Sequence, residues 1–390
     1  MTFTSLTWLA LIVGVTGIYW LLPAPWRNGF LALVSFVFLA SIQLTSALFL
    51  VAFTLISYLI VRKDRVSKAM ITVSVGLVIA VVAYYKMRVA HSPVEVLRDV
   101  AMPIGMSYYA FRVVHYVIDK YRDVLPTHGF YDYVCYLFFV PTMLVGPIHR
   151  FTAFHNNHIA IRWNASELSE GIERILLGYF KIIVLGNFLF NKYLANQIAQ
   201  LDSSNQSLIY YLEAVRGSLN LYVQFSGYSD IAIGFALMLG YRVMENFNNP
   251  FMKTNIAEFW RSWHISLTSW SRDYIYMTMV GLTRNPYLGT LVSLLVVGIW
   301  HELSLRYVIW GLYHGLGIIF VNKLQQYVRR RNRERGLKGK KHPDPLLVKV
   351  LKIFATANYF FFGYIIISQE SFADTLQIYR IIFIGWIGGN

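Results

Sequence analysis

Long apolar runs follow one another along most of the chain. The stretch from residue 28 to residue 61 contains no Asp, Glu, Lys or Arg. About 20 helical residues cross the hydrocarbon core of a bilayer, so this stretch is too long for one span. It predicts two spanning helices with a tight turn near Ser41–Ser46. Residues 5–22 predict a preceding span, and the absence of a small-residue cleavage site after it favours a retained helix over a removed signal peptide.

Further apolar runs predict the rest of a membrane domain. The expected elements lie at about residues 69–85, 102–119, 133–149, 170–195, 207–241, 286–303, 306–322, 350–368 and 375–388. Backbone groups in lipid must be hydrogen-bonded internally, so we expect helices or re-entrant segments, about ten to eleven in all. The alternation typical of β-barrel strands is not evident. The pattern therefore predicts an all-α polytopic membrane protein that crosses and contacts the lipid bilayer.

Composition and charge support this class. Hydrophobic residues make up 56% of the chain and charged residues 14%, against roughly 25% charged in ordinary soluble domains. The net charge of +15 alone would suggest a nucleic-acid partner, but eight Lys and Arg residues lie between Arg329 and Lys341, and a second basic cluster lies at residues 62–68. Basic loops beside spans are typical of the cytoplasmic face, so we expect a basic cytoplasmic loop at 323–349 and no nucleic acid. The single cysteine, Cys135, excludes an internal disulfide and is expected to be a buried apolar residue.

Polar segments that interrupt the apolar pattern are functional candidates, because ionisable groups are costly inside a membrane. Asp230 lies in an otherwise uncharged stretch from residue 217 to residue 241. A structural carboxylate that binds a neighbouring helix is a slightly better interpretation of Asp230 than direct catalysis. His301 ends another uncharged run and precedes Glu302. An imidazole accepts and returns protons near neutral pH, so His301 is a candidate general base, with a hydrogen-bonded packing histidine as the alternative.

A third polar segment is rich in aromatic residues. Trp260, Trp263, Leu267, Trp270 and Tyr274 recur at spacings of three and four, which predicts one stripe along a single helix. His264 lies at the edge of this stripe. The spacing alone favours an interfacial anchor with an incidental histidine over a catalytic segment.

Several other chemistries lack their motifs. The chain has no H-E-x-x-H sequence, no G-x-S-x-G elbow and no P-loop. Its histidines do not form the closely spaced boxes of a membrane di-iron enzyme, so no metal site is expected.

Ordered motifs over residues 100–320 resemble the membrane-bound O-acyltransferase family, in particular the bacterial branch that contains the alginate O-acetylation membrane protein. The matching segments are Met102–Tyr108, Tyr116–Arg122, Phe139–Pro147, Gln224–Asp230, Met244–Phe247, Glu258–His264, Arg272–Tyr276, Gly298–His301 and Trp310–Gly315. The resemblance implies one acyltransferase domain over residues 1–390, with N-terminal helices over 1–100, C-terminal helices over 350–390 and a ring of helices around a thin central funnel.

The same resemblance implies residue roles. The family's essential histidine falls on His301, which would activate an acceptor hydroxyl. A second polar position falls on His264, which with Arg272 or Asp273 would orient the donor or stabilise the developing oxyanion. The resemblance also implies a donor and substrate tunnel lined by Asp230, Trp263, Arg272, Asp273 and Trp300. Two positions depart from the family pattern: Gln224, where an Asp is common, and Glu302, where a Gly is common.

The expected function is transfer of an acyl group from a cytoplasmic thioester to an extracytoplasmic polysaccharide or polyol, and acetyl is the expected acyl group. The donor would be acetyl-CoA or an acyl-carrier protein, with no tightly bound cofactor. A separate extracytoplasmic transferase is the expected partner, and a bacterial plasma membrane the expected location. D-alanyl transfer to teichoic acid is the alternative within the family. A polytopic transporter that uses Asp230 and the histidines, or a non-catalytic membrane scaffold, are the alternatives outside it.

Overall fold

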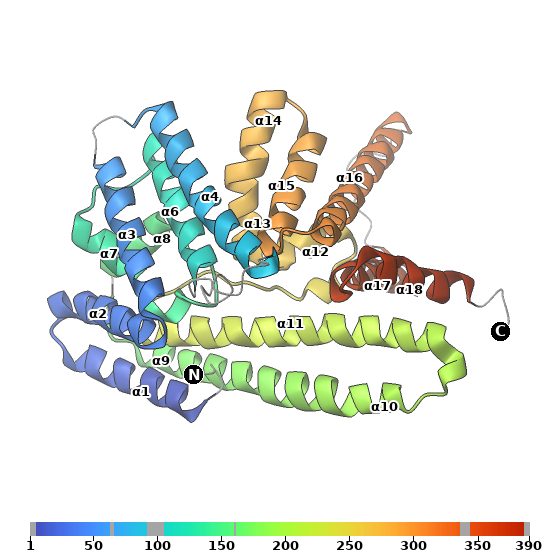
Figure 1. Ribbon diagram of the computed structural model, residues 1–390, viewed down its shortest axis with the longest axis horizontal. Helices are drawn as coiled ribbons and strands as arrows, with labels where there is room; N and C mark the ends of the chain where they lie inside the picture. Colours follow the sequence, from blue (N-terminus) through green and yellow to red (C-terminus); the bar gives the residue numbers. More distant parts are fainter. Residues whose placement is uncertain (1–4, 63–65, 92–104, 160, 336–343, 386–390) are drawn as a thin grey trace. The chain divides into compact units, whose positions relative to one another are not determined.

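The computed structural model describes residues 5–62, 66–91, 105–159, 161–335 and 344–385, and all regular structure among them is helical. Figure 1 shows the helices in chain order. The chain divides into two compact units, one formed by Met1–Ile183 and Phe225–Glu245, the other by Val184–Gln224 and Asn246–Asn390. The prediction of an all-α membrane protein is confirmed. Among the described residues, four helices are long and apolar enough to cross a membrane: Ala24–Ile42, Leu44–Val61, Lys68–Lys86 and Leu346–Ser368.

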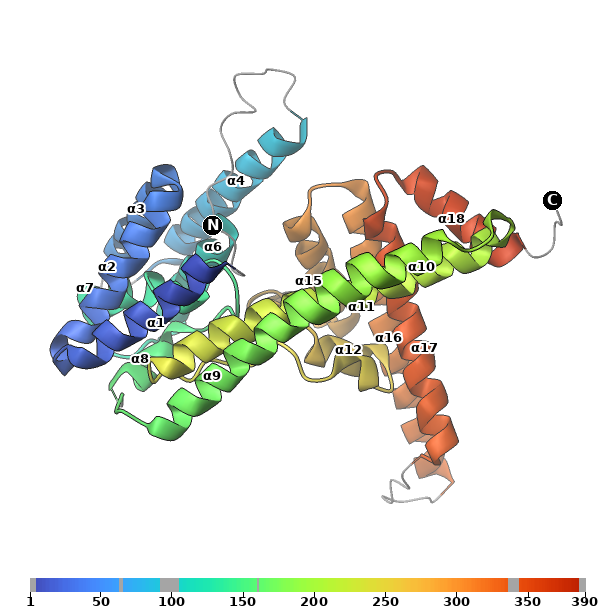
Figure 2. The same cartoon turned by 90° about the horizontal axis from the view of Figure 1, so that it is seen from below.

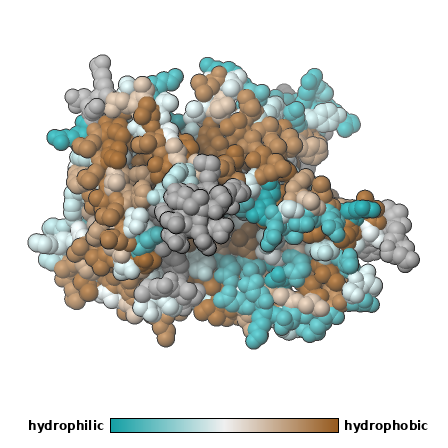
Figure 3. All heavy atoms as spheres, viewed as in Figure 1, coloured by the Kyte–Doolittle hydropathy of each residue, from teal (hydrophilic) through white to brown (hydrophobic). Residues whose placement is uncertain are grey.

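The N-terminal helices of the first unit follow the predicted spans closely. They are α1 (Leu6–Leu21), α2 (Ala24–Ile42), α3 (Leu44–Val61) and α4 (Lys68–His91). The predicted turn in the long uncharged stretch is confirmed, because a single residue, Gln43, separates α2 from α3. Large apolar side chains such as Leu33, Leu48 and Leu59 remain exposed on these helices. Figure 3 shows extensive hydrophobic surface, in brown, on this face of the molecule. Such outward apolar faces are expected where lipid is the solvent.

The span predicted at residues 133–149 is wrong. After α6 (Met106–Tyr121), the chain forms the short helix α7 (Phe130–Leu137), the 3-10 turn η1 (Val140–Thr142), a non-helical stretch and α8 (Phe151–Ile159). Pro141 lies within the 3-10 turn after α7 ends, and Gly146 has a left-handed φ of 102°. A fully buried Arg112 from α6 donates hydrogen bonds to the carbonyl oxygen and, at 2.7 Å, to the hydroxyl of Thr142. Internal hydrogen bonds of this kind permit non-helical backbone in a membrane protein.

Glycines bring two helices of the first unit into close contact. The helix α9 (Ala165–Tyr179) and the later part of α11 (Gln206–Met238) run side by side in both views (Figures 1 and 2). A Cβ on Gly171 would lie 2.7 Å from the carbonyl oxygen of Gly234, and a Cβ on Gly178 would lie 2.6 Å from that of Gly227. Pairs of small residues let backbones approach in this way, which is a common basis of helix association in membranes.

We expect Gly178→Ala to lower the stability of the first unit by about 1–3 kcal/mol, because the new methyl group meets backbone that cannot move aside. The measurement is thermal unfolding in detergent. Gly14→Ala on α1 is the matched control: its Cβ would meet nothing within 4 Å, so it is expected to be neutral or slightly stabilising. Equal unfolding temperatures for the two variants would contradict the close-contact interpretation.

The second unit contains most of the π-helical segment η2 (Phe180–Leu194), α10 (Ala195–Ala199), the first part of α11, and the chain from Asn246 onward. Its C-terminal helices are α17 (Leu346–Ser368) and α18 (Phe372–Ile384), and they pack on α11 through Ala214, Ile365 and Ile378. The helices α15 (Pro286–His301) and α16 (Leu305–Glu334) form a tight pair, since a Cβ on Gly311 would lie 2.8 Å from the carbonyl oxygen of Leu294. Because α16 continues to Glu334, the first part of the expected basic loop is helical.

Candidate active site

The predicted single helix over residues 260–274 is wrong, because it is divided at a histidine. The helix α12 (Ile256–Ser262) ends before Trp263, and α13 (Ile265–Ser271) begins after His264. His264 has φ 43° and ψ 54°, a left-handed conformation that is uncommon for a residue with a side chain. The aromatic stripe is buried rather than interfacial: Trp260, Trp263 and Trp270 are each 7% exposed or less. The corner therefore places His264 in the interior with a backbone conformation that surrounding contacts must hold.

Asn246 supplies those contacts. Its backbone carbonyl accepts a hydrogen bond from the backbone N–H of Ile265, at 2.9 Å. Its side-chain Oδ1 accepts from the hydroxyl of Ser266 at 2.6 Å and lies 3.2 Å from Nδ1 of His264. The Ser266 backbone N–H also points at this oxygen, at 3.4 Å, which identifies it as the carbonyl oxygen of the amide. His264 therefore donates from Nδ1, and its Nε2 carries the lone pair.

The His264 imidazole is neutral in this environment. Its side chain is buried, with 2% of the residue exposed. Burial, and secondarily the nearby His301, lower the pKa of His264 from 6.5 to about 3. Because the charged form is so disfavoured, His264 remains an uncharged hydrogen-bonding group across the physiological pH range.

His301 is the last residue of α15 and is exposed. Three rings surround its imidazole: Trp300 at 4.5 Å between centroids, Tyr307 stacked at 5.9 Å, and Trp310 edge-on at 5.9 Å. The structure brings His301 within electrostatic range of His264, although 36 intervening residues separate them in sequence. An exposed imidazole at a helix end can reach a substrate and exchange a proton with it.

Glu302 contacts the start of the next helix. Its two carboxylate oxygens accept hydrogen bonds from the guanidinium of Arg306, at 2.9–3.2 Å. Arg306 also donates to the backbone carbonyl oxygen of Gln369 at the end of α17. Glu302, which departs from the family pattern, is therefore held by Arg306 of α16.

A cavity of about 460 Å³ lies beside the corner, between α12, α13, α15 and α16. Arg272 lines it, and its guanidinium binds the Asp273 carboxylate at 2.9 Å. Arg261, Ser269 and Ser293 also line it, so the cavity combines apolar walls with cations and hydroxyls. Its volume is in the range of small-molecule sites. Trp263 does not line this cavity but packs among aromatic rings, stacked on Phe259 at 5.5 Å.

Asp230 belongs to the first unit, whereas the other candidates belong to the second. Its carboxylate binds Arg174 at 2.8 Å and Lys181 at 2.6 Å, and Arg174 also binds Glu245 at 2.7 Å. The cations come from α9 and η2, so Asp230 links α11 to a neighbouring helix, as its structural interpretation expects. The Asp230 side chain is 8% exposed, whereas Arg174 and Lys181 are 25% and 22% exposed, so a buried carboxylate is covered by partly exposed cations.

Sequence reasoning did not select Asn246, Arg306 or Tyr307 as site residues. Asn246 lies within one of the motif segments, which is the one signal that pointed to it. Among the residues that the structure describes, no three His, Cys, Asp or Glu side chains are grouped in a way that would hold a metal ion.

Comparison with known proteins identifies the fold's relatives. The family model for the membrane-bound O-acyltransferase family matches residues 31–365. The probable alginate O-acetylase AlgI of Pseudomonas aeruginosa is 29% identical over 98% of this chain and 75% of its own length. The AlgI of Pseudomonas fluorescens is 33% identical over 81% of this chain and 65% of its own length. A teichoic acid D-alanyltransferase of Bacillus subtilis is 29% identical over 61% of each protein. The chain thus spans about two thirds to three quarters of the AlgI proteins it matches.

Proposed function

The chain belongs to the membrane-bound O-acyltransferase family. From this premise we propose that it transfers an acyl group from a thioester to a hydroxyl of an extracytoplasmic polysaccharide, and that this acyl group is acetyl. The observation that carries the site assignment is the exposed His301 at the end of α15, with the rings of Trp300, Tyr307 and Trp310 around its imidazole.

His301 acts as the general base in this proposal. Its imidazole removes the proton of the acceptor hydroxyl as the oxygen attacks the thioester carbonyl carbon. The new C–O bond forms, the C–S bond breaks, and the departing thiolate takes the proton back from the imidazolium. The rings of Trp300, Tyr307 and Trp310 restrict the orientation of His301 and shield it on several sides.

His264 orients the donor rather than stabilising the oxyanion. Its Nδ1–H is directed at Asn246, so Nε2 presents a lone pair. A lone pair accepts a hydrogen bond and does not stabilise negative charge on oxygen. In the proposed complex Nε2 accepts from an amide or hydroxyl of the donor. The 460 Å³ cavity with Arg272 lies next to the same corner and belongs to the proposed donor side, where Asp273 holds the arginine.

The polysaccharide acceptor is favoured over teichoic acid by the extent of the match. The AlgI protein of Pseudomonas aeruginosa aligns with 98% of this chain, whereas the D-alanyltransferase of Bacillus subtilis aligns with 61%. The proposal includes a thioester donor, acetyl-CoA or a carrier protein, that arrives from the cytoplasm of a bacterial cell. It also includes a partner protein, a separate transferase on the extracytoplasmic side of the plasma membrane.

The test is the ester content of the surface polymer in producing cells with and without this protein. We expect loss of O-acetyl esters on removal of the gene and their return on complementation. Mass spectrometry of the released acyl group separates acetyl from D-alanyl. An unchanged ester content would contradict acyl transfer, and loss of D-alanyl esters instead would transfer the assignment to the teichoic acid branch.

A further inference from the structure

An apolar slot of about 450 Å³ lies in the first unit, between α1, α9 and the end of α11. Its lining is apolar apart from Thr16. On α1 the lining extends from Leu9 to Trp20, over which the helix rises about 16 Å. This length is close to half of the roughly 30 Å hydrocarbon core of a bilayer, which is the depth that the acyl chains of one leaflet fill.

The slot is open rather than filled by side chains. Gly17 lines it, and a Cβ on Gly17 would meet nothing within 4 Å. Space between packed helices is normally filled to the density of an organic crystal. Two residues of the lining, Val13 and Leu176, are 58% and 62% exposed, so the slot faces outward, where lipid is the solvent of a membrane protein.

A polar pocket of about 470 Å³ adjoins one end of the slot. Trp163 lines both cavities, and it meets Trp20 edge-on at 5.0 Å between ring centroids. Gly240 lines the polar pocket, and a Cβ there would lie 3.6 Å from the Trp20 ring. Nε1 of Trp20 donates a hydrogen bond to the carbonyl oxygen of Met238 at 2.8 Å. Tryptophans are enriched where hydrocarbon meets the head groups of a bilayer, so the junction of the two cavities has the character of that boundary.

The polar pocket carries a net positive charge. Its ionisable lining residues are Arg162, Arg242 and Glu167, two cations and one carboxylate. Arg242 binds Glu167 at 3.0 Å, which leaves the charge of Arg162 uncompensated. Arg162 is exposed, and no described residue binds its guanidinium. A further cation, Arg27, lies 4.6 Å from the ring of Trp20.

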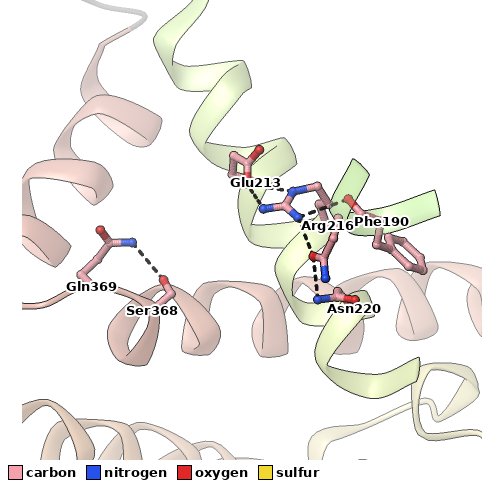
Figure 4. Close-up of polar contacts among 7 residues, drawn as sticks. Phe190, Glu213, Arg216, Asn220, Ser368 and Gln369 are labelled. Atoms are coloured by element: carbon pink, nitrogen blue, oxygen red, sulfur yellow. Dashed lines mark hydrogen bonds and ion pairs between the residues drawn. The ribbon is translucent and has the colours of Figure 1, made fainter. Parts of the chain in front are cut away.

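Arg162 differs from arginines that connect helices. Arg216 of the second unit donates two hydrogen bonds to Glu213 and one to the backbone carbonyl oxygen of Phe190, as Figure 4 shows. Those bonds occupy most of its donors. The five N–H donors of a guanidinium remain available in Arg162, and a guanidinium binds a phosphate group through two parallel hydrogen bonds.

We infer that the slot and the polar pocket together bind one anionic phospholipid of the surrounding bilayer. One acyl chain lies in the slot along α1, and Arg162 binds the phosphate, with Arg27 adding positive charge nearby. The slot alone would accept any acyl chain, and Arg162 alone would be an ordinary solvated cation. Their junction at Trp163 fits a molecule that is apolar at one end and anionic at the other. A zwitterionic head group fits less well, because it adds a positive charge beside the arginines.

The experiment determines which lipid the purified full chain retains. The protein is equilibrated in detergent with equal amounts of dioleoyl phosphatidylglycerol and dioleoyl phosphatidylcholine, and bound lipid is counted by native mass spectrometry. We expect wild-type protein to retain one phosphatidylglycerol with about a tenfold preference, the effect of one charge-assisted hydrogen bond. Added phosphatidylglycerol should also raise the unfolding temperature, because a ligand that binds the folded state stabilises it. Glycerophosphoglycerol, the head group without chains, should not displace the lipid.

Two pairs of variants test the two ends of the site. Gly17→Leu fills the slot and should lower lipid retention at least about tenfold, whereas Gly14→Leu should retain lipid like wild type. Gly14 is the matched control, since its Cβ also meets nothing within 4 Å but it does not line the slot. Arg162→Gln should still retain a lipid but without preference for phosphatidylglycerol. Arg380→Gln, at an exposed position of α18, should leave the preference unchanged.

Several outcomes would overturn the inference. They are equal retention of the two lipids by wild-type protein, wild-type retention in Gly17→Leu, and an unchanged preference in Arg162→Gln. Displacement of the lipid by glycerophosphoglycerol would also overturn it, because the site would then recognise a free phosphate ester and not an acyl chain. Lipid retention is measured without acyl transfer, so its result is independent of the proposed function.

Discussion

Replacing His301 with alanine is expected to lower the rate of ester formation about a thousandfold, within the range that a positioned general base contributes. The acceptor hydroxyl is a poor nucleophile while it keeps its proton, and no other described histidine is both exposed and enclosed by the rings of Trp300, Tyr307 and Trp310. His301→Gln should show the same loss, because glutamine preserves a polar side chain but does not accept the proton. The measurement is the rate at which O-acetyl esters accumulate on the surface polymer of producing cells, with wild-type and variant protein at matched amounts in the membrane.

Two controls keep this result specific. His301 is exposed at a helix end, so its replacement should leave thermal unfolding close to that of wild type. Glu334→Gln, on the exposed basic end of α16, should leave the transfer rate unchanged. A His301→Ala rate within about threefold of wild type would exclude it as the base and favour a scaffold or transporter.

Periodicity and apolar length predicted the spans well where the chain is uniformly apolar. The turn between α2 and α3 was placed to within a few residues, because two bilayer lengths of uncharged sequence leave one arrangement. The same reasoning failed at residues 133–149. There, apolar residues surround a break that Pro141, Gly146 and the buried Arg112 stabilise together. Arg112 lies 30 residues from its partner Thr142, so no local pattern reveals the contact.

In the candidate site, too, sequence predicted the features that depend on local pattern and missed those that depend on distant contacts. His301 was found because a histidine at the end of an uncharged run is unusual in a membrane protein. The corner at His264 was not foreseen, since spacings of three and four also fit a continuous helix and the break depends on Asn246, 18 residues earlier. The anchor of Arg306 on Gln369 lies 63 residues away in sequence. Interactions of this kind arise from tertiary packing, which sequence periodicity does not encode.

Asp230→Ala is expected to cause the largest loss of stability of any single change proposed for this protein, about 3 kcal/mol. The carboxylate is 8% exposed and binds both Arg174 and Lys181, so its removal leaves Lys181 without its carboxylate and Arg174 with the exposed Glu245 alone. The value stays toward the lower end of the effect for fully buried pairs, because the two cations are 22–25% exposed and water reaches them. The measurement is thermal unfolding in detergent, with the amount of protein in the membrane as a second measure.

A matched pair of variants tests whether the lost charge causes the loss of stability. Asp230→Asn preserves the volume and removes the charge, so it should destabilise nearly as much as alanine. Glu245→Gln removes the other carboxylate on Arg174, but Glu245 is 52% exposed, so a loss of no more than about 1 kcal/mol is expected. Wild-type stability in Asp230→Asn would mean that the side chain matters for packing alone. If that variant were stable but inactive in acyl transfer, Asp230 would return to the catalytic candidates, because its function would then not be to hold α11 against α9.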